Sequence, residues 1–249
     1  MDDRDPASYG ESVAAIYDNL HGPQLDTDAA VELLAELAGG GRALELGIGT
    51  GRVALPLAER GIEVVGIDAS EAMVARMRQK PGGDGIEVHV GDFADVDVPG
   101  RFSLVYIPFN TFFALRTQRT QIRCLANVCA HLDEGGCFVL DAFVPDVTRF
   151  RDGQATSVTR IESEQVMLDV SHHDPVSQMI RSRHVVLSEA EGVRLYPVLI
   201  RYCWPAELDA MALCAGLELE GRYGGYDRSR FDHTSRRHVS IYRRRSGSS

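Results

Sequence analysis

The stretch that decides the fold is Arg42-Ala43-Leu44-Glu45-Leu46-Gly47-Ile48-Gly49-Thr50-Gly51. A short apolar run leads directly into three glycines at alternate positions, and residues 52–60 follow at helical spacing. Glycines let the backbone pass close to a ligand, because they carry no Cβ. A strand, a glycine-rich loop and a helix in this order indicate a pocket for a nucleotide-type ligand.

The spacing of these glycines differs from that of dinucleotide-binding loops. Those loops follow G-x-G-x-x-G and face a pyrophosphate, whereas this one follows G-x-G-x-G, with Arg52 where the last glycine would stand. Glu45, two residues before the first glycine, would repel a pyrophosphate but suits a ligand that bears an ammonium group. S-adenosylmethionine (SAM) carries an ammonium and a sulfonium and no phosphate. The loop therefore favours SAM over NAD.

Two carboxylates stand at the ends of the next predicted strands. Asp68 follows the run 63–67, seventeen residues after Gly51, and an acidic group at that position can accept both ribose hydroxyls. Asp92, in Gly91-Asp92-Phe93, follows the run 86–90, where it can accept the adenine amino group beside an aromatic ring. Together with the glycines, these carboxylates predict a SAM site.

The order of elements predicts the fold. Apolar runs at 42–46, 63–67, 86–90, 104–107 and 137–142 alternate with helical patterns, which is typical of parallel strands with helices on both faces. After Pro145, four runs without an intervening helix indicate an antiparallel meander; they span 156–161, 165–173, 179–187 and 193–204. A helix from Pro205 and strands at 217–223 and 238–242 end the chain. The fold class is therefore α/β, a Rossmann-like seven-stranded doubly wound sheet with an antiparallel β extension over the active site.

The same pattern divides the chain into four segments. We expect an N-terminal helical lid (1–40), whose first helix runs from about Tyr9 to Leu20, and a SAM-binding core (41–150). The antiparallel extension (151–204) would form a roof over the acceptor, and the last segment (205–245) would complete the sheet. His172 and His173 are expected on opposite faces of one solvated strand.

Composition limits the partners and the location. The net charge of −10 and the pI near 5.3 argue against nucleic acid, whose phosphates attract basic surfaces. The acidic start is unlike a signal peptide, and no run reaches the roughly 18 apolar residues of a membrane span. The 5 cysteines are scattered and lack the spacing of a zinc site, so we expect reduced thiols, no metal and a cytoplasmic location. A homodimer stays open.

Four motifs in order carry a family resemblance. They are E-L-G-I-G-T-G (45–51), G-I-D-A-S (66–70), G-D-F (91–93) and H-L-x-x-G-G (131–136). This series resembles that of class I SAM-dependent methyltransferases and covers residues 9–144. Within that family the chain is similar to small-molecule methyltransferases of actinobacterial secondary metabolism, including amino-sugar N,N-dimethyltransferases.

The resemblance implies roles for individual residues. Tyr17 would cap the methionine end of SAM, Arg52 would meet its carboxylate, and Phe109-Asn110-Thr111 would lie beside the transferred methyl. We expect Tyr9 and Tyr17 to be the catalytic residues, although Tyr17 could instead fill the core. In the amino-sugar enzymes a histidine can follow the segment that corresponds to Phe109-Asn110-Thr111. Residues 112–115, which follow it here, include no histidine. The predicted cofactor-binding residues are Tyr17, Glu45, Gly47, Gly49, Gly51, Arg52, Asp68, Ala69, Met73, Asp92, Phe93, Phe109 and Asn110.

The leading hypothesis is methyl transfer from SAM to a small-molecule acceptor, at O, N or C. Such an in-line displacement depends mainly on positioning, which contributes roughly 7–11 kcal/mol in favourable cases. Two alternatives are an NAD-dependent oxidoreductase and a SAM-binding regulatory protein without catalysis. A nucleic-acid amino-methyltransferase is disfavoured. Those enzymes often carry the motif (D/N/S)-P-P-(Y/F/W) after the fourth strand, whereas this chain reads Ile107-Pro108-Phe109-Asn110 there and lacks the second proline.

Overall fold

The computed structural model describes residues 7–18, 26–95 and 98–245. Its larger sheet consists of β1 (Ala43–Leu46), β2 (Val64–Asp68), β3 (Glu87–Val90), β4 (Phe102–Ile107), β5 (Leu132–Phe143), β10 (Leu217–Tyr223) and β11 (Arg237–Arg244). Its second sheet consists of β6 (Gln154–Ile161), β7 (Gln165–Asp174), β8 (Met179–Ser188) and β9 (Gly192–Arg201). The α-helices are α1 (Ser8–Val13), α3 (Thr27–Ala38), α4 (Ala54–Glu59), α5 (Glu71–Arg78), α6 (Gln118–His131) and α7 (Pro205–Cys214). Short 3₁₀ turns cover Gly83–Gly85, Thr111–Ala114 and Val147–Arg149.

The larger sheet has the strand order β10-β11-β5-β4-β1-β2-β3. Strands β1 to β5 pair in parallel, and β11 inserts antiparallel between β5 and β10. The order reverses at β1, where the chain first runs outward to β3 and then returns to β4. In open sheets of this kind, ligands bind at the carboxyl ends of the strands beside the reversal. The predicted seven-stranded Rossmann-like sheet is confirmed.

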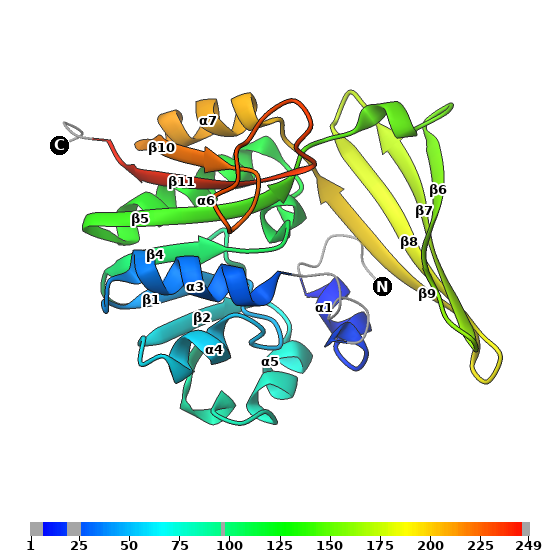
Figure 1. The fold of residues 1–249 in the computed structure, drawn as a ribbon, viewed down its shortest axis with the longest axis horizontal. Coiled ribbons are helices and arrows are strands. Elements are labelled where there is room, and N and C mark those ends of the chain that lie inside the picture. The colour runs from blue at the N-terminus through cyan, green and yellow to red at the C-terminus, as the bar shows by residue number, and fades with distance from the viewer. Residues whose placement is uncertain (1–6, 19–25, 96–97, 246–249) are drawn as a thin grey trace.

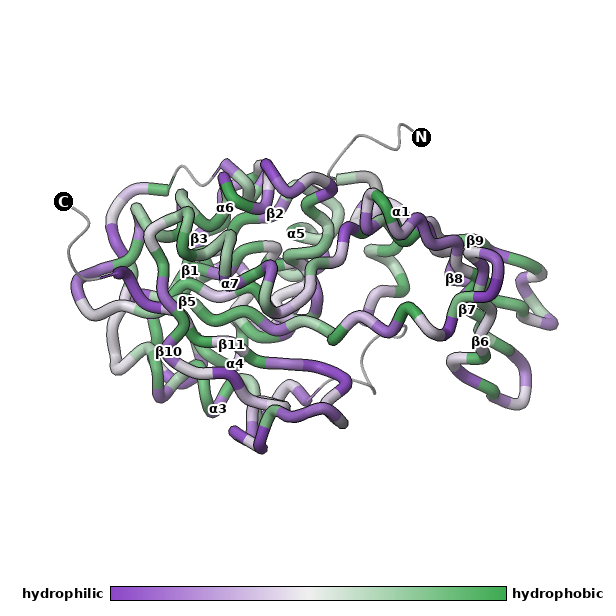
Figure 2. The backbone as a smooth tube through the Cα atoms, turned by 90° about the horizontal axis from the view of Figure 1, so that it is seen from above, coloured by the Kyte–Doolittle hydropathy of each residue, from purple (hydrophilic) through white to green (hydrophobic). Residues whose placement is uncertain are grey.

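Two apolar layers hold this sheet between helices. One face packs on α6 and α7, with Leu125 and Met211 fully enclosed. The other face packs on α3 and α4, with Leu34 and Leu57 enclosed in the same way. Figure 1 shows these helices on either side of the strands, and Figure 2 shows the apolar strands gathered in the middle of the larger body. The predicted covering of both faces is confirmed.

The second sheet is an antiparallel meander in the order β6-β7-β8-β9. It stands beside the larger sheet, and α1 lies between the two (Figure 1). Helix α1 contacts both neighbours: Val13 packs with Met167 and Tyr196 of the second sheet, while Glu11 accepts a hydrogen bond from Ser70 before α5. The antiparallel extension expected after Pro145 is therefore present.

Three element boundaries differ from those predicted. The N-terminal helix ends at Val13 rather than near Leu20, because a tighter turn follows in which the Ile16 N–H donates to the Val13 carbonyl; Leu20 lies outside the described residues. The predicted break at 133–136 is part of β5, where the pairing with β4 shifts register and the extra residues are absorbed. Strand β9 stops at Arg201, since residues 202–204 lead into α7. Within the described ranges, no helix is long and apolar enough to cross a membrane.

Candidate active site

A cavity of about 1220 Å³ opens at the carboxyl ends of β1, β2 and β4 and extends to the second sheet. Eleven of the predicted site residues line it, namely Tyr9, Tyr17, Gly47, Gly49, Asp68, Ala69, Met73, Asp92, Phe93, Phe109 and Asn110. Glu45, Gly51 and Arg52 lie outside this lining. One cavity thus brings together residues from the glycine loop, from three strand ends and from the N-terminal segment.

The glycine loop is shaped by backbone conformations that other residues rarely adopt. Gly47, Gly49 and Gly51 have φ values of 75°, 56° and 75°, in the left-handed region that favours glycine. A Cβ on Gly47 would also lie 2.5 Å from the Thr111 Cγ2, and one on Gly51 would lie 2.5 Å from the Met77 Cγ. The loop backbone therefore packs so closely on Thr111 and Met77 that a side chain at Gly47 or Gly51 would clash. Gly47 and Gly49 line the cavity.

Asp68 fixes the loop to the end of β2. One carboxylate oxygen accepts the Gly49 N–H at 2.7 Å and the other accepts the Ser70 N–H at 2.8 Å. Burial raises the pKa of this carboxyl, against the opposing effect of these backbone donors. A carboxylate offers about four acceptor sites, so Asp68 keeps room for a further donor such as a ribose hydroxyl. Asp92 is similar, since its Oδ1 accepts the Ala94 N–H at 2.9 Å.

Glu45 lies beneath the loop, away from the cavity lining. Its side chain is buried, and the Tyr106 hydroxyl donates to it at 2.8 Å. Burial raises the pKa of Glu45 to about 8, although the Tyr106 bond works in the opposite direction. Buried there and bonded to Tyr106, Glu45 supports the loop from below. Its predicted contact with the ammonium group of SAM stays a prediction.

Arg52 offers the clearest test of whether the site fits SAM. Its Nε and Nη2 atoms are buried and have no hydrogen-bond partner among the described residues. The guanidinium lies 5.6 Å from the centre of the Tyr17 ring, and Nη2 is 3.8 Å from the nearest Asp18 oxygen. A buried cation needs hydrogen bonds to offset its desolvation. Such donors suit a carboxylate like that of the methionine part of SAM, and the contact of Arg52 with that carboxylate stays a prediction because Arg52 lies outside the cavity lining. The glycines and Asp68, which do line the cavity, fit this cofactor.

Phe109 and Asn110 form a strained turn after β4. Both have positive φ, 56° and 66°, and two consecutive non-glycine residues in this region persist only where the surroundings hold them. The Asp141 carboxylate accepts the Phe109 N–H at 3.2 Å, and the Asn110 Oδ1 accepts the Phe143 N–H at 2.6 Å. Arg237 pairs with Asp141 at 3.2 Å. The end of β5 thereby sets the position of the residues predicted to flank the transferred methyl.

Sequence reasoning missed Asp141, although a signal was present. A carboxylate inside the apolar run 137–142 must find partners when it is buried. Burial raises its pKa, while Arg237 and the Phe109 N–H lower it. The expectation for the histidine pair was half wrong: His173 is buried, with its Nε2 2.9 Å from the Tyr202 hydroxyl, whereas His172 is exposed.

Tyr9 and Tyr17 line the cavity from the N-terminal segment. Both pack against the cluster of Val13, Met167 and Tyr196 that joins this segment to the second sheet. Burial is the largest cause that raises the pKa of each phenol above its ordinary value, and for Tyr17 Arg52 opposes it. Both hydroxyls therefore stay protonated at neutral pH and can donate hydrogen bonds. Their catalytic role stays a prediction.

Comparison with known proteins identifies the class that this fold and site define. A methyltransferase-domain family model matches residues 43–136. The cypemycin N-terminal methyltransferase of a Streptomyces species is 31% identical over 244 residues, covering 96% of this chain and 99% of that protein. The CcbJ methyltransferase of Streptomyces caelestis has a structure that superposes with a TM-score of 0.92 at 41% identity, covering 97% of this chain and 100% of that one.

A further relative is the dTDP-4-amino-2,3,4,6-tetradeoxy-D-glucose N,N-dimethyltransferase of Saccharopolyspora spinosa. It is 27% identical over 172 residues, covering 66% of this chain and 67% of that protein. The chain belongs to the class I SAM-dependent methyltransferases. The prediction of methyl transfer from SAM is confirmed, and an NAD-dependent oxidoreductase is set aside.

Proposed function

We propose that this methyltransferase acts on an amine nitrogen of a small-molecule acceptor in secondary metabolism. The relative from Streptomyces methylates an N-terminus and that from Saccharopolyspora an amino sugar, as their names state. The sequence alone left oxygen, nitrogen and carbon open. Two relatives with different scaffolds share only the amine, and that shared chemistry supports nitrogen here.

The observation that carries the proposal is the continuity of the cavity. The same space is bounded by Gly47 and Asp68 on one side and by Ser171 and Ser182 of the second sheet on the other. When bound, SAM supplies a methyl group activated by its sulfonium. The chain's residues then position an acceptor and exclude water. We propose that residues 151–204 form the acceptor roof and that residues 1–40 form the lid.

The test is a panel of acceptors incubated with the chain and SAM, in which S-adenosylhomocysteine is measured by mass spectrometry. The panel contains D-glucosamine, L-alanylglycinamide and morpholine, each beside its N-acetyl derivative as a matched control. We expect methylation of at least one free amine, with the added mass on nitrogen, and none of the acetylated controls. Methylation of a hydroxyl group of N-acetyl-D-glucosamine would contradict the proposed acceptor class.

The proposal also includes the cellular location and the oligomeric state. The described cysteines are all free thiols, which supports a cytoplasmic location. The homodimer is a prediction that light scattering of the purified chain decides. Small-molecule acceptors remain the expected partners, without nucleic acid or membrane.

A further inference from the structure

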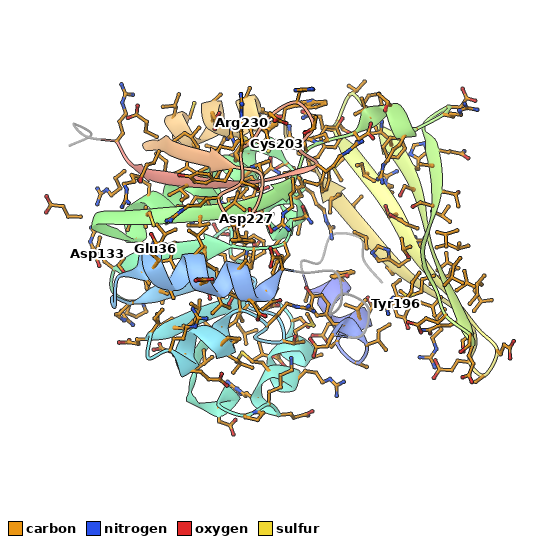
Figure 3. All side chains as sticks on the ribbon, in the orientation of Figure 1. Glu36, Asp133, Tyr196, Cys203, Asp227 and Arg230 are labelled. Carbon is orange, nitrogen blue, oxygen red and sulfur yellow. The ribbon has the colours of Figure 1, made fainter. Side chains whose placement is uncertain are left out.

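One face of the second sheet carries an acidic residue and a histidine side by side. Asp169 of β7 pairs directly with His184 of β8, and His184 pairs with Tyr196 of β9. Directly opposed residues of antiparallel strands point to the same face. Tyr196 packs against Val13 of α1, and Figure 3 shows it between β9 and that helix. Asp169 and His184 therefore face the larger sheet, and both line the cavity.

Two serines in the neighbouring row hold the carboxylate in place. The Ser171 hydroxyl donates to the Asp169 Oδ1 at 3.1 Å, and the Ser171 and Ser182 hydroxyl oxygens lie 2.7 Å apart. Both serines are buried and line the cavity. A carboxylate held beside an imidazole fixes the orientation of the ring and stabilises its protonated form. The register of β7 on β8 thus places a carboxylate beside an imidazole on the cavity wall, which are the two kinds of group that a histidine general base uses.

We propose that His184, oriented by Asp169, is the general base that accepts a proton from the acceptor amine. The inference rests on the proposed amine acceptor. An aliphatic amine enters as an ammonium ion without a free lone pair. The N–H bond breaks and the proton moves to the His184 imidazole. The freed lone pair then forms the N–CH₃ bond while the C–S bond breaks, its electron pair stays on sulfur, and the imidazolium returns its proton to solvent.

The two phenols on the cavity wall are less suited to this step. The phenols of Tyr9 and Tyr17 have raised pKa values because they are buried, so they hold their protons at neutral pH. Burial lowers the pKa of His184, and the attraction of Asp169 opposes that effect. The other titratable groups on this face or packed against it include His173 of β7, Arg160 of β6, Arg194 and Tyr196 of β9, Glu11 of α1, and the two phenols.

The test compares His184→Asn and Asp169→Asn with a matched control, His89→Asn. His89 also pairs with a carboxylate, at 2.8 Å from Glu87, but lies on β3 away from the cavity. With the best amine of the panel, we expect His184→Asn to lower kcat about 100-fold at pH 7, within the usual range for general-base loss. Affinity for S-adenosylhomocysteine should stay unchanged. Asp169→Asn should lower kcat about tenfold, and the control should match the wild type.

The pH profile separates a base from a structural residue. Without a base, the rate depends on the free-amine fraction, so kcat of His184→Asn should rise about tenfold per pH unit up to the amine's own pKa. The wild type should level off earlier, once His184 has lost its proton. Parallel profiles, or loss of S-adenosylhomocysteine binding together with kcat, would overturn the proposal.

A second measurement works without turnover. In the chain labelled with ¹³C-histidine and saturated with S-adenosylhomocysteine, the His184 signal should shift when L-alanylglycinamide is added, while the His89 signal should not. An unmoved His184 signal would overturn the assignment. If no panel amine is methylated but the His184 signal shifts, the proposed function has failed and the amine-binding role of His184 stands.

Discussion

The two sheets build their parts of the cavity by different means. At the strand ends of the larger sheet, the backbone dominates: glycines in the left-handed region and N–H groups bonded to Asp68 set the shape. On the second sheet, side chains dominate: Ser171, Ser182 and His184 project from the middle of regular strands. A backbone-built wall tolerates few substitutions, whereas a side-chain wall can change its chemistry without changing its fold.

The junction between the sheets is built from buried polar groups. Arg201, at the end of β9, pairs with Glu207 of α7 at 2.7 Å and donates to the Gln121 side chain of α6 at 2.6 Å. Its second amino group also donates to Gln178 at 2.8 Å. Removing one partner of such a buried pair costs about 3–5 kcal/mol. These bonds to α6 and α7, which cover the larger sheet, therefore hold the end of β9 in place.

The strongest test of the backbone-built wall is Gly47→Ala. Its Cβ would lie 2.5 Å from the Thr111 Cγ2, and the φ of 75° is strained for alanine. We expect SAM affinity to fall more than 100-fold, which corresponds to about 3 kcal/mol, as measured by calorimetry. Gly61→Ala is the matched control, since its φ is 83° but its Cβ would meet nothing within 4 Å. It should lower only stability, and equal loss of affinity in both variants would refute the argument.

A smaller effect is expected from Arg52→Met. The substitution removes two buried donors without a hydrogen-bond partner among the described residues, together with the ion pair to Asp18, so the stability of the chain without cofactor should change little. SAM affinity should fall about 10- to 100-fold, because hydrogen bonds to charged groups contribute about 1.5–3 kcal/mol. The affinity for 5′-methylthioadenosine, which lacks the amino-acid part, should stay the same. Equal losses for both ligands would show that Arg52 does not bind the carboxylate.

The same contrast explains what the sequence could predict. The glycine spacing and Asp68 allowed a SAM site to be predicted, because backbone conformation restricts residue type and therefore leaves a local pattern. The parallel core and the meander followed from strand and helix alternation. Glu45 shows the limit of such patterns: its position in the motif was recognised, but its burial beneath the loop and its bond to Tyr106 depend on packing between strands.

The proposed acceptor side left no comparable signal in the sequence. Asp169 and His184 are fifteen residues apart in the sequence, and only the register of β7 on β8 places them together. A one-residue shift of that register would turn His184 to the other face. The sequence instead made the adjacent pair His172-His173 conspicuous and predicted a solvated strand there, yet the His173 ring packs against Phe150 and Tyr202. The register between two strands of a hairpin cannot be predicted from composition and periodicity alone.

The smallest expected effect decides to which of the two regions α1 belongs. Ser70 caps α5 by accepting the Met73 N–H at 3.2 Å and donates to the Glu11 carboxylate of α1 at 2.8 Å. Ser70→Ala removes both bonds and should lower the free energy of unfolding by about 1 kcal/mol, as cap removal does, with a Tm shift of roughly 2–4 °C.

Glu11→Ala removes only the bonds to α1 and leaves the cap. If α1 moves with the second sheet, through Val13 and Tyr196, Glu11→Ala should leave Tm unchanged and speed the release of S-adenosylhomocysteine a few-fold in stopped flow. An equal Tm loss in both variants would instead assign α1 to the larger sheet. In that case the lid would be part of the backbone-built wall, and acceptor entry would depend on the second sheet alone.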